Sequence, residues 1–311
     1  MSHPLRKLAP VAANARIGVV APASFARPER IENGVSALRR LGYEPRFMEH
    51  ALARGPLFFA GTPEQRIADL HAAFNGADTE MVMSLRGGYG SNHLLDALDW
   101  NLIARHAKPF FAYSDLTGMQ LHLLDREGIP AFHGPMLAAD FFLEDGVHLP
   151  SFHAALKGEP CTVGADAGLR AIKAGAANGV LYGGCLSILV SLLGTAWEPQ
   201  TEGKLLFVED VGAKPYQIDR MLWQLRKAGK FAGVKGFVFG EMLDCVSPGA
   251  DPGLLDEVIQ NAFLDFDGPV AIGLRSGHVS RQNVTLTFGT EAALTVGDET
   301  TLAILKPAVA G

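Results

Sequence analysis

The sequence predicts an α/β protein of two domains, with a parallel sheet in the first half and further strands in the second. Apolar segments of strand length alternate with segments whose apolar residues recur at helical spacing. A length of 311 residues exceeds what one ordinary core requires. Residues 157–179 are rich in Ala and Gly and nearly free of large apolar side chains, which is typical of a boundary. We therefore expect domains over residues 1–160 and 175–311.

In the first half, four apolar segments are typical of buried strands: residues 16–21, 44–49, 80–85 and the segment that ends at Tyr113. Helical patterns separate these segments. The clearest begins at Thr62-Pro63-Glu64-Gln65, which supplies a cap, a proline for the first turn and a capping-box glutamine. We expect Ser91 to cap another helix. This alternation predicts a parallel sheet, and such sheets bind ligands beyond the carboxyl ends of their strands.

The second half resumes the alternation after the Ala- and Gly-rich stretch. Strands are expected at residues 204–208, 236–240 and 269–274, with helices at 216–229 and 254–263. Alternating apolar residues at 284–288 and 292–296 predict antiparallel strands that complete the second domain.

Composition and charge exclude several classes of function. A net charge of −6 without a basic cluster argues against a nucleic-acid partner. Three cysteines without a Cys-x-x-Cys pair argue against a disulfide framework or a structural zinc site, so we expect no metal. No apolar run reaches the length of a membrane span or a signal peptide. We therefore expect a cytoplasmic protein with no membrane partner.

Ser114 is the first candidate for catalysis. It lies where an apolar strand ends and a helical pattern begins, so its side chain is expected at the carboxyl edge of the sheet. The first helical N–H groups and the helix dipole favour a developing negative charge there, which suits a nucleophilic serine. The alternative is that Ser114 and Asp115 are only helix caps.

Two polar residues of the second half end apolar strands in the same way. Glu209 follows residues 205–208, and His278 follows residues 270–274 after a short loop. A hydrolytic serine needs a histidine base, and the base needs a third group to orient it. Glu209 and His278 fit these roles, although Glu209 could be an ordinary cap and the neighbouring Asp210 could replace it. His133 lies in a similar loop and is a weaker candidate, expected to line the site.

The glycine-rich loop Arg86-Gly87-Gly88-Tyr89-Gly90 also follows a strand. It could be a tight turn, or its amides could hold an anion. It lacks the Gly-x-Gly-x-x-Gly fingerprint and no Walker lysine follows, so nucleotide binding is weakly supported and we expect no cofactor.

With these residues together, the sequence resembles the LD-carboxypeptidase family of serine peptidases (family S66), which includes muramoyltetrapeptide carboxypeptidases and microcin-immunity peptidases. The resemblance rests on five motifs in the family's order: Arg86-Gly87-Gly88-Tyr89-Gly90-Ser91, Tyr113-Ser114-Asp115-Leu116-Thr117, His133-Gly134-Pro135, Leu206-Phe207-Val208-Glu209-Asp210-Val211-Gly212 with Pro215-Tyr216 and Ile218-Asp219-Arg220, and Gly277-His278. Ala112, Arg275 and Cys185 depart from the family pattern, where glycine, proline and asparagine are usual. No departure removes a candidate catalytic residue.

The resemblance implies a nucleophile at Ser114, a base at His278 and an orienting carboxylate at Glu209. It also implies a flavodoxin-like first domain, a mixed-sheet second domain and a homodimer. On this hypothesis the amides of Gly88 and Asp115 hold the oxyanion. The expected substrate-binding residues are Arg86, Tyr89 and His133.

Three functions remain open from the sequence. The first is a serine carboxypeptidase that releases terminal D-alanine from murein tetrapeptides in cell-wall recycling. The second is a microcin-immunity-like peptidase that cleaves a peptidyl-nucleotide amide, for which Trp197 or Tyr182 could stack on the base. The third is a peptide-binding protein without catalysis.

Overall fold

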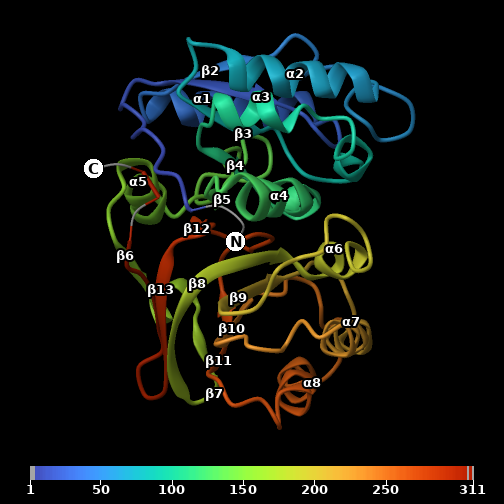
Figure 1. Ribbon diagram of the computed structural model, residues 1–311, viewed down its shortest axis with the longest axis vertical. Coiled ribbons are helices and arrows are strands. Elements are labelled where there is room, and N and C mark those ends of the chain that lie inside the picture. Colours follow the sequence, from blue (N-terminus) through green and yellow to red (C-terminus); the bar gives the residue numbers. More distant parts are fainter. Residues whose placement is uncertain (1–3, 307, 310–311) are drawn as a thin grey trace.

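Two sheets lie one above the other in the computed structural model, which describes residues 4–306 and 308–309 (Figure 1). The first sheet contains, in spatial order, β12 (Leu286–Phe288), β5 (Ala131–His133), β4 (Phe110–Ala112), β3 (Met81–Ser84), β1 (Arg16–Val20) and β2 (Glu44–Phe47). The second contains β6 (Cys161–Val163), β14 (Thr301–Ile304), β13 (Glu291–Val296), β8 (Gly175–Cys185), β9 (Lys204–Glu209), β10 (Gly236–Gly240), β11 (Val270–Leu274) and β7 (Arg170–Lys173).

Strands β1 to β5 of the first sheet are parallel and have the order 2-1-3-4-5. This is the flavodoxin-like order, so the expected fold of the first half is confirmed. The second sheet is mixed, because β8 to β11 are parallel while β7, β13, β14 and β6 pair antiparallel. The expected α/β class is therefore confirmed for both halves.

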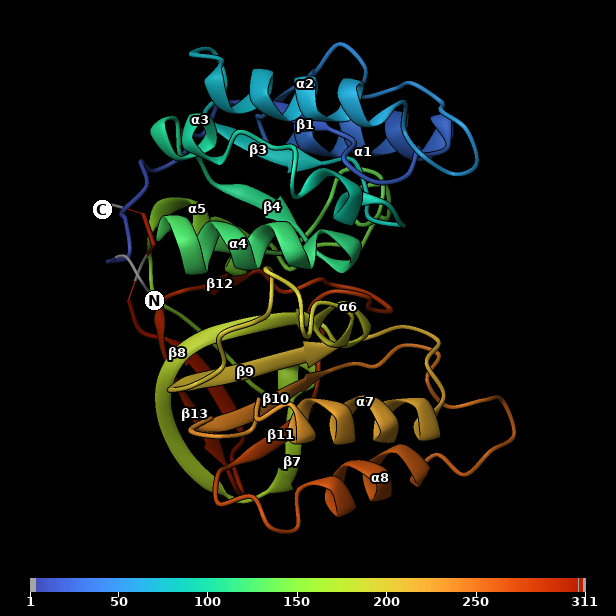
Figure 2. The ribbon, with the colours of Figure 1, turned by 45° about the vertical axis from the view of Figure 1, so that its right-hand side comes forward.

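Helices cover the sheets and separate them. Those of the first half are α1 (Pro28–Arg40), α2 (Pro63–Asn75), α3 (Trp100–Arg105), α4 (Thr117–Glu127) and α5 (Leu149–Lys157), with short 3₁₀ helices η1 (Ser91–Leu94) and η2 (Ser114–Leu116). Those of the second half are η3 (Ala165–Ala167), α6 (Leu186–Ser191), α7 (Pro215–Lys227) and α8 (Leu254–Ala262). Helix α4 contacts both β5 and β8, and α7 packs on α8 beside the second sheet (Figure 2). None of the helices in the described residues is both long enough and apolar enough to span a bilayer.

The capping box predicted at the start of α2 is present. The Thr62 side chain accepts a hydrogen bond from the Gln65 amide at 3.3 Å, and the Gln65 side chain accepts one from the Thr62 amide at 2.9 Å. Two amide groups that the helix itself leaves unpaired are thereby satisfied.

The helix expected after Ser91 is reduced to the short η1. The Ser91 amide donates to Asp115 Oδ2 at 2.8 Å, and its hydroxyl donates to the Asp115 carbonyl at 2.6 Å. The residue that would cap a helix thus ties the glycine-rich loop to the segment that carries Ser114.

Residues 157–179, where the domain boundary is predicted, contain β6, η3, β7 and the beginning of β8. One further expectation for the second half was wrong. Strand β12 does not complete the second sheet; it pairs antiparallel with β5, Leu286 lying opposite His133. A strand from late in the chain thus extends the first sheet, and the domain division at residues 160–175 stays a prediction.

Candidate active site

The site forms where the two sheets meet. Strands β3 and β4 of the first sheet and β9 and β11 of the second end at this level, and the loops after them carry the candidate residues. The structure thus brings together residues that are distant in the sequence, as expected for the carboxyl ends of parallel strands.

Ser114 lies at a strained turn between β4 and α4. Its φ of 66° is in the left-handed region, which non-glycine residues seldom occupy. Strain at a serine between a strand and a helix is the geometry of a nucleophile elbow. Gly87 makes room for it, because a Cβ atom at that position would lie 2.8 Å from Ser114 Cβ and 3.0 Å from its Oγ. The nucleophile role is therefore favoured over a simple helix cap.

Gly88 and Asp115, the residues of the oxyanion hypothesis, both lie near Ser114. Gly88 lines the same cavity as Ser114, and Asp115 is the next residue along the chain. The Asp115 carboxylate accepts from the Ser91 amide, which fixes the turn. Among the described residues, neither the Gly88 amide nor the Asp115 amide donates to another protein group, so both can donate to a substrate oxygen.

Glu209 holds His278 through two hydrogen bonds to one carboxylate oxygen. His278 Nδ1 donates to Glu209 Oε2 at 2.7 Å, and the His278 amide donates to the same atom at 3.0 Å. The pair leaves Nε2 of His278 for another partner. Gly277 permits this approach, since a Cβ atom there would lie 2.6 Å from the Glu209 carboxyl carbon. The geometry is that of an oriented histidine base.

The surrounding charges act on both partners of this pair. Burial alone would lower the pKa of His278, but the charge and hydrogen bond of Glu209, with the charges of Asp210 and Asp140, raise it above its ordinary value. Burial alone would raise the pKa of Glu209, but His278 and His133 hold it well below its ordinary range. Glu209 is therefore ionised at neutral pH and favours an imidazolium at His278.

Asp210 does not take the orienting role in this arrangement. Its carboxylate accepts from the Ser187 amide and the Val211 amide, both at 2.8 Å. The side chain stabilises the start of α6 and its own loop, while Glu209 faces the imidazole.

His133 lies behind Glu209 and has no exposed surface. Its Nδ1 lies 3.1 Å from Ser276 Oγ, and its Nε2 lies 3.9 Å from Glu209 Oε1, which is too far for a hydrogen bond. The expectation that His133 lines the substrate site does not fit this placement. Strand β12 pairs beside β5, with Leu286 opposite His133, and no local pattern around His133 indicates this pairing.

A cavity of about 220 Å³ connects the catalytic groups. Ser114 and His278 both line it, together with Arg86 as expected. Arg30, which was not a candidate, lines it too. A sequence signal existed, because Arg30 lies in the first turn of α1, the helix that follows β1.

Asp140 was also missed, and no sequence pattern marks it. Burial raises the pKa of Asp140 to about 6, although the Met136 amide, the Asn283 side chain and the Tyr113 hydroxyl donate hydrogen bonds to it. Asp140 lines the cavity and contributes to the raised pKa of His278.

Tyr89 lies outside this cavity. It packs against Phe58 and Phe59, with ring centroids 5.4 and 5.9 Å away, and remains 45% exposed. The described residues contain no cluster of three His, Cys, Asp or Glu side chains that could bind a metal ion.

Comparison with known proteins gives matches over most of the chain. The family model of the LD-carboxypeptidase N-terminal domain matches residues 17–134, and that of the C-terminal domain matches residues 178–294. A probable murein peptide carboxypeptidase of Bacillus subtilis is 34% identical over 91% of this chain and 90% of its own length.

Solved structures share the fold along almost the whole chain. The muramoyltetrapeptide carboxypeptidase of Oxalobacter formigenes superposes with a TM-score of 0.82 at 28% identity, covering 94% of this chain and 99% of that one. An MccF-like protein of Bacillus anthracis superposes with a TM-score of 0.88 at 25% identity, covering 96% and 99%.

Proposed function

The chain belongs to the LD-carboxypeptidase family, and on that premise we propose that it is a serine carboxypeptidase that releases terminal D-alanine from murein tetrapeptides. The family and the carboxypeptidase names of its relatives support the reaction class. One observation of the site supports it most: Ser114, on a strained elbow, lines the same cavity as a His278 that is hydrogen-bonded to Glu209.

The proposed mechanism follows from these positions. Ser114 Oγ attacks the carbonyl carbon between the diamino acid and D-alanine, and His278 Nε2 takes the hydroxyl proton. The amides of Gly88 and Asp115 donate to the oxyanion, each interaction being worth about 3 kcal/mol when well aligned. His278 then gives the proton to the leaving amine. Water, activated by the same imidazole, releases the acyl group and restores Ser114.

Arg30 and Arg86 are proposed to bind the terminal carboxylate of the substrate. Both residues line the cavity, and neither forms an ion pair with another described residue, although the Arg30 guanidinium lies over the Phe142 ring. Burial and the nearby charge of Arg30 lower the pKa of Arg86. Two such cations beside a nucleophile favour an anionic group there, which is what distinguishes the end of a chain from an internal peptide bond.

Tyr89 is too far out to contact D-alanine in this arrangement. We assign it to parts of the peptide that extend beyond the cavity, where its exposed ring lies on the Phe58 and Phe59 side chains. His133 is proposed to support Glu209 from behind rather than to contact the substrate.

Neither of the two residues proposed to stack on the base of a peptidyl-nucleotide substrate lies in the catalytic cavity. Tyr182 is fully buried and donates to Asp125 Oδ2 at 2.6 Å. Trp197 packs against Trp100 and against His122 of α4, and its ring nitrogen donates to Asp96. Neither ring lines the cavity with Ser114.

A competition assay tests the choice of substrate. Purified protein is offered equal concentrations of a murein tetrapeptide and an aminoacyl-sulfamoyl adenosine conjugate, and the products are identified by mass spectrometry. The account predicts faster cleavage of the tetrapeptide. Preference for the conjugate would overturn the proposed substrate, and retention of both compounds uncleaved would indicate a binding protein.

The family also leads us to propose a cytoplasmic homodimer acting in cell-wall recycling. Sedimentation velocity on the purified chain tests the oligomeric state, with a dimer expected and a monomer at all concentrations contradicting it. Cell fractionation tests the compartment.

A further inference from the structure

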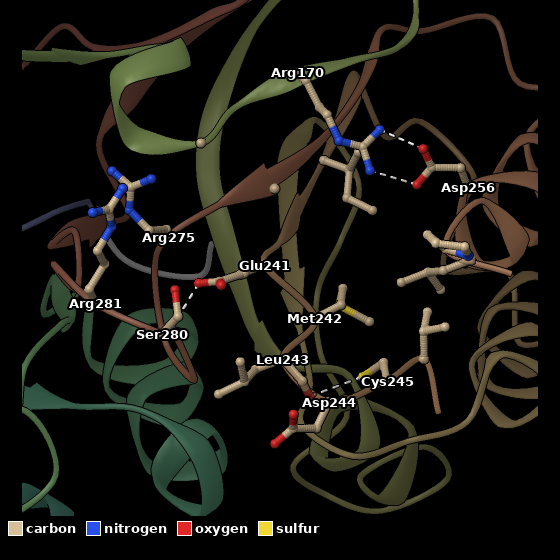
Figure 3. A pocket seen from close by; sticks show the side chains of 16 residues that line it. Arg170, Glu241, Met242, Leu243, Asp244, Cys245, Asp256, Arg275, Ser280 and Arg281 are labelled. Carbon is tan, nitrogen blue, oxygen red and sulfur yellow. Dashed lines mark hydrogen bonds and ion pairs between the residues drawn. The ribbon is translucent and has the colours of Figure 1, made fainter. Parts of the chain in front are cut away.

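The loop that carries His278 runs between two cavities. His278 and Val279 line the catalytic cavity, and the next residues, Ser280 and Arg281, line a second cavity of about 520 Å³ (Figure 3). Figure 3 shows Ser280 against Glu241 in the wall of the second cavity, where the Ser280 amide donates to the Glu241 carboxylate at 2.9 Å. A loop with a cavity on each side is held less by packing than by hydrogen bonds. The position of the imidazole therefore depends on the bonds that fix this loop.

The two ends of the loop are joined at its base. The Val284 amide donates to the Arg275 carbonyl at 2.7 Å, and the Ser276 hydroxyl donates to the Val284 carbonyl at 2.8 Å. These bonds close the loop but do not reach Gly277, the residue directly before His278. Gly277 needs a support of its own.

Asn283 provides that support through its side chain, which has no exposed surface. Asn283 Oδ1 accepts a hydrogen bond from the Gly277 amide at 3.0 Å, and Asn283 Nδ2 donates one to the Gly277 carbonyl at 3.1 Å. One side chain thus binds both backbone groups of Gly277, as a partner residue does in an antiparallel strand pair.

Asn283 also binds Asp140, because its Nδ2 donates a second hydrogen bond to Asp140 Oδ1 at 2.9 Å. The orientation of the amide group is fixed by its partners. The Gly277 carbonyl and the Asp140 carboxylate accept hydrogen bonds, so both require the nitrogen, whereas the Gly277 amide requires the oxygen.

Asp140 extends these bonds to the neighbour of the nucleophile. The Tyr113 hydroxyl donates to Asp140 Oδ1 at 3.3 Å, and the Met136 amide donates to Asp140 Oδ2 at 2.8 Å. Tyr113 directly precedes Ser114. A continuous chain of hydrogen bonds therefore leads from the residue before the nucleophile to the residue before the base.

This chain of bonds joins the two halves of the molecule. Ser114 follows β4 of the first sheet, whereas Glu209 ends β9 and His278 follows β11 of the second. The Glu209–His278 pair orients the imidazole, but it lies wholly within the second half and cannot fix the distance to Ser114. Proton transfer needs hydrogen-bond reach, and a displacement of about 1 Å can cost about a hundredfold in rate.

We propose that Asn283 and Asp140 are positioning residues that set the separation of Ser114 Oγ and His278 Nε2. The inference rests on the proposed function, because it takes these two atoms to exchange the proton. Asn283 acts through Gly277 and is not among the residues that line the catalytic cavity. Its loss should therefore slow the chemical step without weakening substrate binding.

The first test measures kcat and KM of Asn283→Ala on a murein tetrapeptide. The proposal predicts that kcat falls about tenfold or more while KM stays within about twofold of the wild type. An unchanged kcat in folded Asn283→Ala, or an effect on KM alone, would overturn the proposal.

The control variant is Thr201→Ala, which also removes a buried side-chain hydrogen bond. The Thr201 hydroxyl donates to the Lys230 carbonyl at 2.8 Å, and Thr201 precedes β9, at the other end of that strand from Glu209. Thr201→Ala should lower stability in urea unfolding and leave kcat unchanged. It thus separates loss of stability from loss of positioning.

The second test breaks the same chain of bonds at its other end. Tyr113→Phe removes only a hydroxyl and keeps the buried ring, so it is expected to fold even if Asn283→Ala does not. It should lower kcat about threefold, since the bond that it removes is long. In the double variant the combined loss should be smaller than the product of the two separate factors, because both changes break one chain. A wild-type kcat in Tyr113→Phe, or two factors that simply multiply, would overturn the proposal.

The two proposals fail in different ways. If the wild-type protein releases no D-alanine from the tetrapeptide, the proposed function is wrong. The positioning role is then measured with a fluorophosphonate, which bonds to Ser114 Oγ through phosphorus as fluoride leaves and needs the base but not the peptide. Asn283→Ala should slow this modification about tenfold by mass spectrometry, and a rate equal to the wild type would overturn the positioning role. A wild-type Ser114 that does not react at all would overturn both proposals.

Discussion

The backbone conformation of Ser114 fits the role of a nucleophile. Ser114 has a left-handed φ of 66° and lines the cavity with His278. A serine that only capped α4 would not need this conformation, since cap residues are normally extended. The strain is therefore best explained by the nucleophile role.

The Glu209–His278 pair gives a prediction about pH. The charge of Glu209 raises the pKa of His278, and only the neutral imidazole can accept the Ser114 proton. Activity should therefore rise with pH through a pKa above the ordinary histidine value. Glu209→Gln removes the charge, so the acidic limb of kcat/KM should move to lower pH while the maximal rate falls.

The pH profile of Glu291→Gln, at a surface site paired with Lys306, provides the control and should match the wild type. An acidic limb that stays in place in Glu209→Gln would tell against Glu209 as the orienting residue. Asp210→Asn would then be the next variant to titrate.

At the scale of single elements, the loop after β11 is fitted to Glu209. Gly277 has φ +89°, and a Cβ atom there would collide with the Glu209 carboxyl group. Gly229, at the end of α7, has φ +77° and open space around the same position. The two glycines thus share a left-handed backbone conformation, but only at Gly277 would a Cβ atom collide with another side chain.

Replacing each of these glycines by alanine separates the two effects. Gly229→Ala should cost about 1 kcal/mol of unfolding free energy from backbone strain and leave activity unchanged. Gly277→Ala should cost more and should lower kcat/KM by at least about tenfold, because the carboxylate must move away from His278. Urea unfolding and steady-state kinetics measure both, and similar kcat/KM values for the two variants would contradict this explanation.

Local patterns predicted the elements well where a helix or strand is decided by its own residues. The capping box of α2 is an example, since Thr62 and Gln65 satisfy each other within one turn. The helix expected after Ser91 failed because Ser91 is bonded to Asp115, a partner 24 residues away. Ser114, Glu209 and His278 were found because each follows an apolar strand. Arg30 was overlooked, although it lies on the helix that follows β1. Asp140 follows no apolar strand, so the same criterion could not find it.

At the scale of the whole molecule, the pairing of strands β8 and β12 could not be predicted from the sequence. The beginning of strand β8 lies in the Ala- and Gly-rich stretch where the boundary is predicted, and its small residues have a structural reason. A Cβ atom at Gly179 would lie 3.1 Å from the Gly203 carbonyl oxygen on the chain leading into β9. A strand built of such small residues has the same composition as a linker. Only its pairing with β9 and β13 shows that β8 is a strand, and this pairing cannot be read from the local sequence.

Strand β12 joins the two halves into one unit and leads to a prediction about unfolding. It pairs along the edge of β5, with Leu286 opposite the buried His133, although it lies about 150 residues later in the chain. We expect the full chain to unfold in a single calorimetric transition. The fragment 1–160 lacks β12 and exposes β5, so it should be much less stable. A fragment that unfolds cooperatively at the temperature of the full chain would contradict this expectation.

The most direct measurement of the central claim is the release of free D-alanine from a murein tetrapeptide, followed by chiral chromatography for the wild type and Ser114→Ala in parallel. The account predicts one D-alanine per tetrapeptide from the wild type. For Ser114→Ala it predicts a loss of about 10⁴-fold or more, with an unchanged circular dichroism spectrum. Release of D-alanine by Ser114→Ala at a rate near that of the wild type, or none from the folded wild-type protein, would contradict it.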